Sequence, residues 1–208
     1  ELEDLDFQNA LADKAAPADI AKRLVPGYRV LLRVSDGRNL WVRFDWPVRL
    51  GRSVDSHFPI DHPAVSREHA LVVDDAQGLR LVARAPARLD GTKVCGSVRL
   101  PPTAILELAG VSLRVDVAAD ALHVEQAGGH GLLVARGSSV MTTLAGHVLP
   151  ITLACSDAGE ISALPNNRTR HGDRLLQEPL LLLVGDTLRS GDLTFDVVET
   201  FGLAKKPT

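Results

Sequence analysis

The chain has 208 residues, of which 45% are hydrophobic and 24% charged, with a formal net charge of −3 and a sequence pI of about 6.2. This length and composition are sufficient for a buried core in one large domain or in two small ones. The charge balance excludes an overall basic surface, so no nucleic acid partner is predicted.

Membrane insertion and secretion are not predicted either. The longest apolar runs, such as residues 180–184, are far too short to cross a bilayer, and no signal-peptide pattern is present at the start. Cys95 and Cys155 lack the Cys-x-x-Cys spacing of a metal or redox site, which favours reduced thiols. We therefore expect a cytoplasmic location.

Residues 1–27 differ from the rest of the chain. Leu2, Leu5 and Phe7 fall loosely on one helical face, and Pro26-Gly27 is a stop signal. We predict an N-terminal helical extension or linker.

From Tyr28 onward the pattern becomes typical of strands. Residues 28–34 and 40–44 flank a turn centred on Asp36-Gly37, and further short strands follow with a turn signal about every ten residues. Helices do not alternate with strands, which excludes a Rossmann-type fold. The pattern predicts an all-β antiparallel sandwich.

Two loops in this region carry groups suited to phosphate. Gly51 permits a sharp turn after the strand ending at Leu50, and Arg52 follows it. Ser66 and Arg67 lie in the next loop, rich in turn formers. A guanidinium, a hydroxyl and a second cation on neighbouring loops can bind a dianionic phosphate through charge-assisted hydrogen bonds. Alone, each motif is far more typical of an ordinary solvated surface than of a phosphate site.

Together, three motifs resemble the forkhead-associated (FHA) domain, a phosphothreonine-binding β-sandwich. They are Gly51-Arg52, Ser66-Arg67-Glu68-His69 and the segment from Asp90-Gly91-Thr92 to Cys95-Gly96. The resemblance covers residues 28–118. It implies that Arg52, Ser66 and Arg67 bind phosphate, and that a buried His69 supports the Ser66 loop.

The resemblance also assigns the third motif. It implies peptide contacts at Leu89 and Asp90, with Gly91 and Thr92 as structural support. In the family an asparagine holds the peptide backbone, but here Asp90 and Cys95 stand where asparagines are usual. An ionised Asp90 accepts hydrogen bonds but cannot donate them, which weakens the expected clamp.

A second, smaller β-sandwich is predicted over residues 119–200, followed by a tail at 201–208. Its last segment, 185–198, resembles the closing hairpin of the family, which indicates a degenerate second repeat. An alignment of Arg136 with Arg52 and of His147 with His69 puts Leu144 in place of the serine. No phosphopeptide binding is expected there. An unrelated β domain is the alternative.

No enzyme, cofactor or metal site is predicted. The chain lacks a Gly-x-Ser-x-Gly elbow, and His57, His62 and His69 have neither helical pairing nor a cysteine partner. The predicted function is a phosphothreonine-dependent protein interaction in signalling or assembly, with a phosphothreonine-containing protein as partner. The alternative is a phosphorylation-independent structural module in a larger assembly such as a secretion system.

Overall fold

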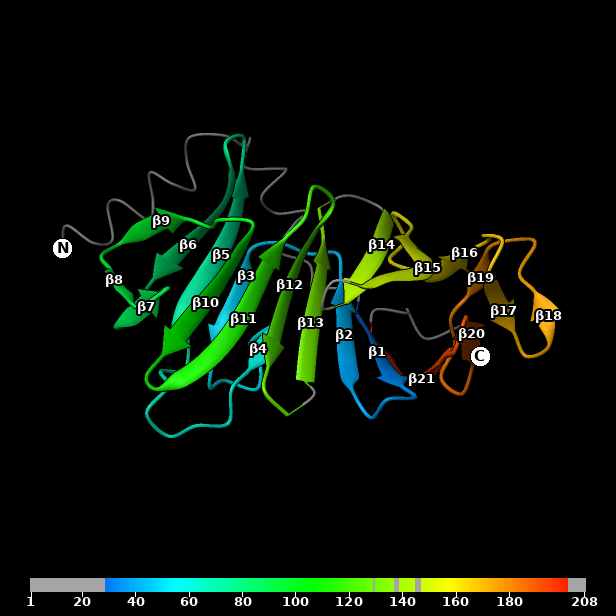
Figure 1. Ribbon diagram of the computed structural model, residues 1–208, viewed down its shortest axis with the longest axis horizontal. Coiled ribbons are helices and arrows are strands. Elements are labelled where there is room, and N and C mark those ends of the chain that lie inside the picture. The colour runs from blue at the N-terminus through cyan, green and yellow to red at the C-terminus, as the bar shows by residue number, and fades with distance from the viewer. Residues whose placement is uncertain (1–28, 129, 137–138, 145–146, 202–208) are drawn as a thin grey trace. The chain divides into compact units, whose positions relative to one another are not determined.

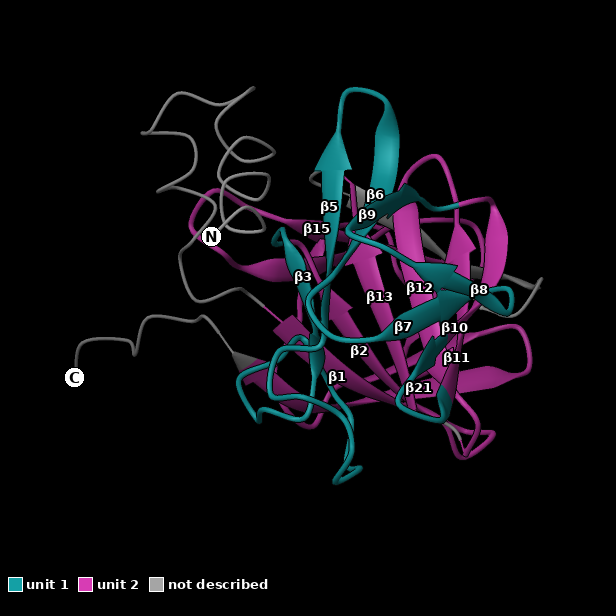
Figure 2. Cartoon of the chain, turned by 90° about the vertical axis from the view of Figure 1, so that its left-hand side faces the viewer, with its two compact units in different colours: residues 1–26, 45–100, 107–111 teal, residues 27–44, 101–106, 112–208 magenta. Residues whose placement is uncertain are grey.

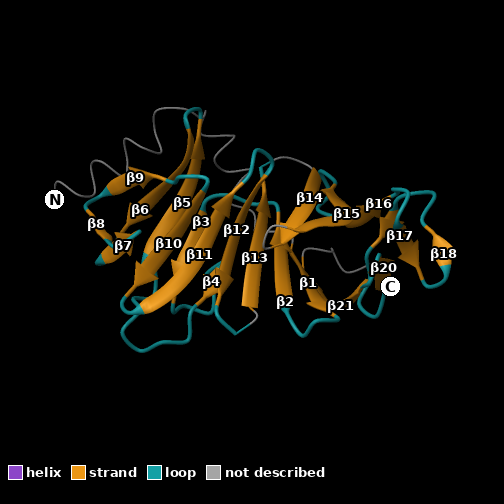
Figure 3. Ribbon diagram, viewed as in Figure 1, coloured by secondary structure: helices purple, strands orange, loops and turns teal. Residues whose placement is uncertain are grey.

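The computed structural model describes residues 29–128, 130–136, 139–144 and 147–201 (Figure 1). All regular structure in these ranges is β-strand, as Figure 3 shows, so the all-β prediction is confirmed. The predicted helical extension, and residues 202–208 of the predicted tail, lie outside the described residues. The described residues contain no helix that could span a membrane.

The chain divides into two compact units, coloured separately in Figure 2. Among the described residues, unit 1 holds 45–100 and 107–111, and unit 2 holds 29–44, 101–106 and 112–201.

Unit 1 contains a five-stranded sheet in the order β4-β3-β5-β6-β9. Its strands are β3 (Val48–Gly51), β4 (Phe58–Pro59), β5 (Ala70–Asp75), β6 (Gly78–Ala83) and β9 (Ser97–Arg99). β3 pairs antiparallel with β5 and parallel with β4. Alternate residues are buried, among them Val48, Leu50, Leu79 and Leu81, which makes this face of the sheet the core of the unit.

A short hairpin in unit 1, β7 (Ala87–Leu89) and β8 (Thr92–Val94), carries the third sequence motif at its turn. The chain then enters unit 2 through β10 (Thr103–Leu108), whose first residues belong to that unit.

Unit 2 contains two sheets. In the larger one the strand order is β18-β17-β20-β21-β1-β2-β13-β12-β11-β10, and the smaller has the order β14-β15-β16-β19. The N-terminal strands are β1 (Arg29–Val34) and β2 (Asn39–Arg43), followed by β11 (Val111–Val117), β12 (Ala121–Gln126) and β13 (His130–Ala135). The later strands are β14 (Ser139–Leu144), β15 (His147–Cys155), β16 (Ile161–Leu164), β17 (Thr169–His171), β18 (Arg174–Leu175), β19 (Leu180–Leu181), β20 (Thr187–Ser190) and β21 (Leu193–Phe201).

The core of unit 2 combines residues from both ends of the chain. Val30, Leu32 and Leu40 of the first hairpin pack in one cluster with Phe195 and Val197 of the last strand. The packing units therefore differ from the segments expected from sequence, since β1 and β2 were expected to pack within 28–118. The division at residue 118 between related domains stays a prediction.

Candidate phosphate-binding site

Gly51 brings two loops of unit 1 into close contact. A Cβ atom there would overlap the carbonyl group of Arg67 and lie 2.9 Å from the carbonyl oxygen of Ser66. Two backbone hydrogen bonds hold the loops together, one from Arg52 N to Ser66 O at 2.8 Å and one from Ser53 N to Arg67 O at 3.0 Å. The glycine predicted for a sharp turn is thus required for close backbone approach as well.

The exposed Arg52 side chain is fixed at its base. Its Nε donates to the carbonyl oxygen of Val65 at 3.2 Å. Within the described ranges its two terminal nitrogens have no recorded partner. One hydrogen bond therefore orients the guanidinium while its outer donors stay available.

Ser66 and Arg67 are also exposed, and their backbone carbonyls rather than their side chains hold the loops together. No described residue bonds the Ser66 hydroxyl or the Arg67 guanidinium. Arg67 lines a small polar cavity of about 220 Å³ together with Arg49, Ser53, Asp55, Ser56 and Glu68. All three predicted phosphate-binding groups thus lie on two joined loops, and each has donors without a partner among the described residues.

The acidic neighbour of Arg67 is already paired. Glu68 Oε1 lies 2.8 Å from Arg84 Nη1, and both side chains are more than a third exposed. In such a solvated pair the stabilisation is small. The pair nevertheless gives the Glu68 carboxylate a cationic partner other than Arg67.

His69 is 1% exposed and joins the Ser66 loop to the segment before β7. Its Nδ1 accepts a hydrogen bond from the backbone N–H of Ser66 at 3.0 Å, and its Nε2 lies 3.0 Å from the carbonyl oxygen of Pro86. Because a carbonyl only accepts, the proton is on Nε2. The carbonyl oxygen of His69 accepts from the backbone N–H groups of Arg84 and Ala85.

The β7–β8 turn places the remaining predicted residues. Asp90 and Gly91 have φ values of 48° and 77°, the pattern of a two-residue hairpin turn with both central residues in the left-handed region. Asp90, Gly91 and Thr92 are exposed, whereas Leu89 is only 8% exposed. A peptide contact at Leu89 is therefore restricted to its backbone.

Sequence reasoning missed the part played by His57, which it considered as a metal ligand and rejected in that role. It is 5% exposed, and its Nε2 lies 2.9 Å from Asp45 Oδ2. Its Nδ1 accepts from the backbone N–H of Arg49 at 3.2 Å. This buried ring anchors the loop after Arg52 to the start of β3. No sequence signal separates it from a solvated histidine.

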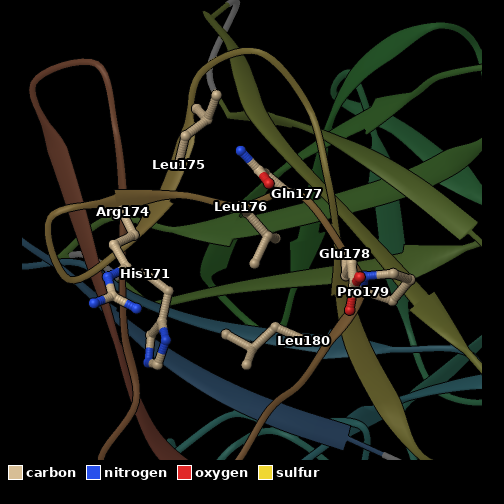
Figure 4. Close-up of a pocket in the computed structure, with 8 residues that line it drawn as sticks. All are labelled: His171, Arg174, Leu175, Leu176, Gln177, Glu178, Pro179 and Leu180. Carbon is tan, nitrogen blue, oxygen red and sulfur yellow. The ribbon is translucent and has the colours of Figure 1, made fainter.

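The described residues contain no group of three or more His, Cys, Asp or Glu side chains that could hold a metal ion. A cavity of about 610 Å³ lies in unit 2 and contains none of the predicted site residues (Figure 4). It is bounded by His171, Arg174 and the segment 175–180. His171 there already faces Asp186 at 3.3 Å.

The family model of the FHA domain matches residues 48–109. These residues form an FHA domain. The match includes the two joined loops and the β7–β8 turn, and it excludes β1, β2 and the chain after residue 109. No curated protein shows significant sequence similarity to the chain.

Solved structures of FHA domains show limited similarity to this chain. The FHA-2 domain of a Mycobacterium tuberculosis ABC transporter is 21% identical over 39% of this chain and 76% of that chain, with a TM-score of 0.34. The FhaA FHA domain, complexed with the intracellular domain of Rv3910, is 23% identical over 39% and 92%, with a TM-score of 0.30. A third structure, from a structural and functional analysis of phosphothreonine-dependent FHA domain interactions, is 23% identical over 39% of this chain and 88% of that chain, with a TM-score of 0.31.

Proposed function

We propose that this FHA domain binds a phosphothreonine segment of a partner protein, and that the chain acts as a non-catalytic adaptor in signalling or assembly. One observation carries the proposal. Arg52, Ser66 and Arg67 present donors that no described residue bonds, from two loops that backbone hydrogen bonds join. A phosphothreonine carries about −1.5 to −2 charge and three strong acceptor oxygens, which matches this donor set.

The loop design supports a preformed site. The backbone bonds across Gly51 and the two His69 ring contacts fix the loops before any ligand arrives. Binding then loses little conformational freedom, which favours affinity. A cytoplasmic location is part of the proposal, and Cys95 and Cys155 form no disulfide in the described part of the chain, which is compatible with a reducing compartment.

Asp90 favours the second candidate function, a phosphorylation-independent structural module in a larger assembly. Its carboxylate adds negative charge to the exposed turn and cannot donate to a peptide carbonyl. Neither effect removes the donors at Arg52, Ser66 and Arg67, so phosphopeptide binding remains the first proposal.

A paired peptide library separates the two functions. Calorimetric titration would compare a degenerate phosphothreonine library with its unphosphorylated twin, using the full chain. If binding depends on phosphothreonine, titration with the phosphorylated library should give a heat of binding, and titration with the unphosphorylated library should give none. Equal binding of both libraries, or binding of neither, contradicts the proposal and favours the structural module.

A further inference from the structure

Several local contacts occur twice in the chain. In unit 1 the backbone N–H of Leu100 donates to the carbonyl oxygen of Leu79 at 2.9 Å, next to β6 and β9. In unit 2 Leu182 donates to Ile161 at the same distance, next to β16 and β19. All four residues are buried, and the sequence separation within each pair is identical.

The β7–β8 and β17–β18 hairpins show a second repeated contact. Arg88 Nη1 donates to the carbonyl oxygen of Gly91 at 3.3 Å, and Arg170 Nη1 donates to that of Asp173 at 2.8 Å. The difference in residue number between Arg88 and Arg170 is the same as that between Leu100 and Leu182. The same strand plan therefore occurs in both halves of the chain, β1–β11 and β12–β21.

The first hairpins of the two halves also correspond. In each, two buried apolar residues of the first strand face two of the second strand: Val30↔Val42 and Leu32↔Leu40 in β1–β2, and Leu122↔Val134 and Val124↔Leu132 in β12–β13. Adding one constant to the four residue numbers of the first hairpin gives the four residue numbers of the second.

These corresponding hairpins are not paired within their own halves. β1 pairs antiparallel with β21, the last strand of the second half, while β12 pairs antiparallel with β11, the last strand of the first half. β2 and β13 pair in parallel between them. The counterparts are β20 and β10, β21 and β11, β1 and β12, and β2 and β13. When each strand is replaced by its counterpart, the central order β20-β21-β1-β2-β13-β12-β11-β10 is the same from either end.

We infer that the chain is a tandem repeat in which the two first hairpins are exchanged, so that each repeat incorporates the β-hairpin encoded by the other. The core of unit 2 supports the exchange of hairpins, because it combines Val30, Leu32 and Leu40 of the first repeat with Leu153 and Phe195 of the second. Exchange of an identical element between two copies is a known low-cost route to association. Here the two copies lie in one chain.

Charge distinguishes the exchanged pairing from a closed pairing, in which each repeat would keep its own first hairpin. In the exchanged arrangement Arg33 lies opposite Asp196, and the corresponding pair is Arg114 opposite Glu125. If each repeat were closed, Arg33 would face Arg114 and Glu125 would face Asp196. Opposite charges across strands stabilise and like charges destabilise, so both pairs favour exchange.

The second repeat has lost the binding segment. Residues 52–69 join β3 to β5 and carry Arg52, Ser66, Arg67 and His69. The corresponding strands β14 and β15 are joined by residues 145–146 alone. Between the described strands β14 and β15 the second repeat consequently has no counterpart of the segment that presents these groups.

Four cysteine pairs test the exchange in the full chain, with Cys95→Ser and Cys155→Ser as background. Directly opposite strand residues lie within the Cα separation that a disulfide spans. After mild oxidation, Arg33→Cys with Asp196→Cys and Arg114→Cys with Glu125→Cys should crosslink within the monomer. The matched pairs Arg33→Cys with Arg114→Cys and Glu125→Cys with Asp196→Cys should not. The reverse pattern, or a covalent dimer, overturns the inference.

A charge reversal gives an independent readout if a double-cysteine variant fails to fold. Under exchange, Arg33→Glu should lower Tm by about 2 °C, and adding Asp196→Lys should restore it. With closed repeats, Arg33→Glu would remove a repulsion from Arg114 and raise Tm instead. The outcome does not depend on phosphopeptide binding, so failure of either proposal leaves the other interpretable.

Discussion

At the residue scale, Arg52 is the first test of the site. Its only recorded side-chain bond in the described chain is to Val65 O, and its outer donors face solvent. Arg52→Ala should weaken phosphopeptide binding about a hundredfold, since two charge-assisted bonds contribute roughly 3 kcal/mol or more. Stability should change by no more than about 0.5 kcal/mol. Calorimetry and urea unfolding measure the two quantities.

Two further variants serve as controls for Arg52. Arg99→Ala removes an exposed arginine on β9 and should leave the affinity unchanged. His69→Ala removes a buried ring that bonds both Ser66 N and Pro86 O, so both affinity and stability should fall. If Arg52→Ala retains wild-type affinity, the site is assigned to the wrong residues.

Asp90 provides a second prediction. Asn tolerates the left-handed conformation observed at this position, so Asp90→Asn should leave the turn intact. It supplies one donor, worth about 0.5–1.5 kcal/mol, and relieves repulsion of comparable size. The affinity for a phosphothreonine peptide should rise roughly tenfold.

Salt separates the two contributions at Asp90. Because only the electrostatic part is screened, the gain should shrink between low and high ionic strength. Titration of wild type and variant with the same peptide at both salt levels provides the measurement. Unchanged affinity would mean that the peptide does not cross this turn, and weaker binding would mean that Asp90 contacts a cationic partner.

At the scale of elements, β12 contains an unusual buried group. His123 is 3% exposed, neither ring nitrogen has a hydrogen-bond partner in the described chain, and its Nδ1 lies 3.8 Å from Asp116 Oδ2. Burial lowers the pKa of His123 below its usual 6.5; Glu125 and Asp116 oppose this shift, and Arg114 and Arg38 add to it.

This lowered pKa predicts a pH dependence. Between the folded pKa and 6.5 the unfolded chain binds a proton that the folded chain does not, so stability falls as pH drops below about 6.5. His123→Leu should reduce this slope. Urea unfolding of both proteins from pH 8 to pH 5 measures it, and identical slopes would show that another group is responsible.

The strands themselves were largely readable from sequence, because apolar alternation and turn residues are local signals. The hairpins at 28–44 and 185–198 and the strand into Gly51 are all observed. The alignment of Arg136 with Arg52 is not supported by the strand pairing. Arg136 precedes β14, whose Val140↔Leu153 pair corresponds to Val48↔Val72. That alignment overlooked a deletion, which no motif in a single sequence marks.

Side-chain burial and long-range pairing were also beyond the sequence. The burial of Leu89 and the anchoring of His57 by Asp45 depend on neighbours distant in the chain. The pairing of β1 with β21 depends on a choice between two similar edges, β21 and β11. Local periodicity is the same for both choices, so it cannot distinguish them.

At the scale of the whole molecule, the two repeats predict a stoichiometry. Only the first has the segment 52–69, so one chain should bind one phosphothreonine peptide. Calorimetric titration of the full chain should give one site, and Arg52→Ala should weaken that site about a hundredfold without uncovering another. Two sites in the wild type, or a phosphate-dependent site of undiminished affinity in Arg52→Ala, would show that the second repeat binds phosphate by other groups.

The pairing of the first strand with the last also has a consequence for synthesis. Thr194 N, near the start of β21, donates to Ser35 Oγ, just past the end of β1, across 159 positions. At about 5–20 residues per second, a ribosome needs roughly ten to thirty seconds between making these two residues. Throughout that interval the edge of β1 lacks its final partner. The nascent chain must keep this edge from pairing with β11, and the like charges of Arg33 and Arg114 oppose that premature contact.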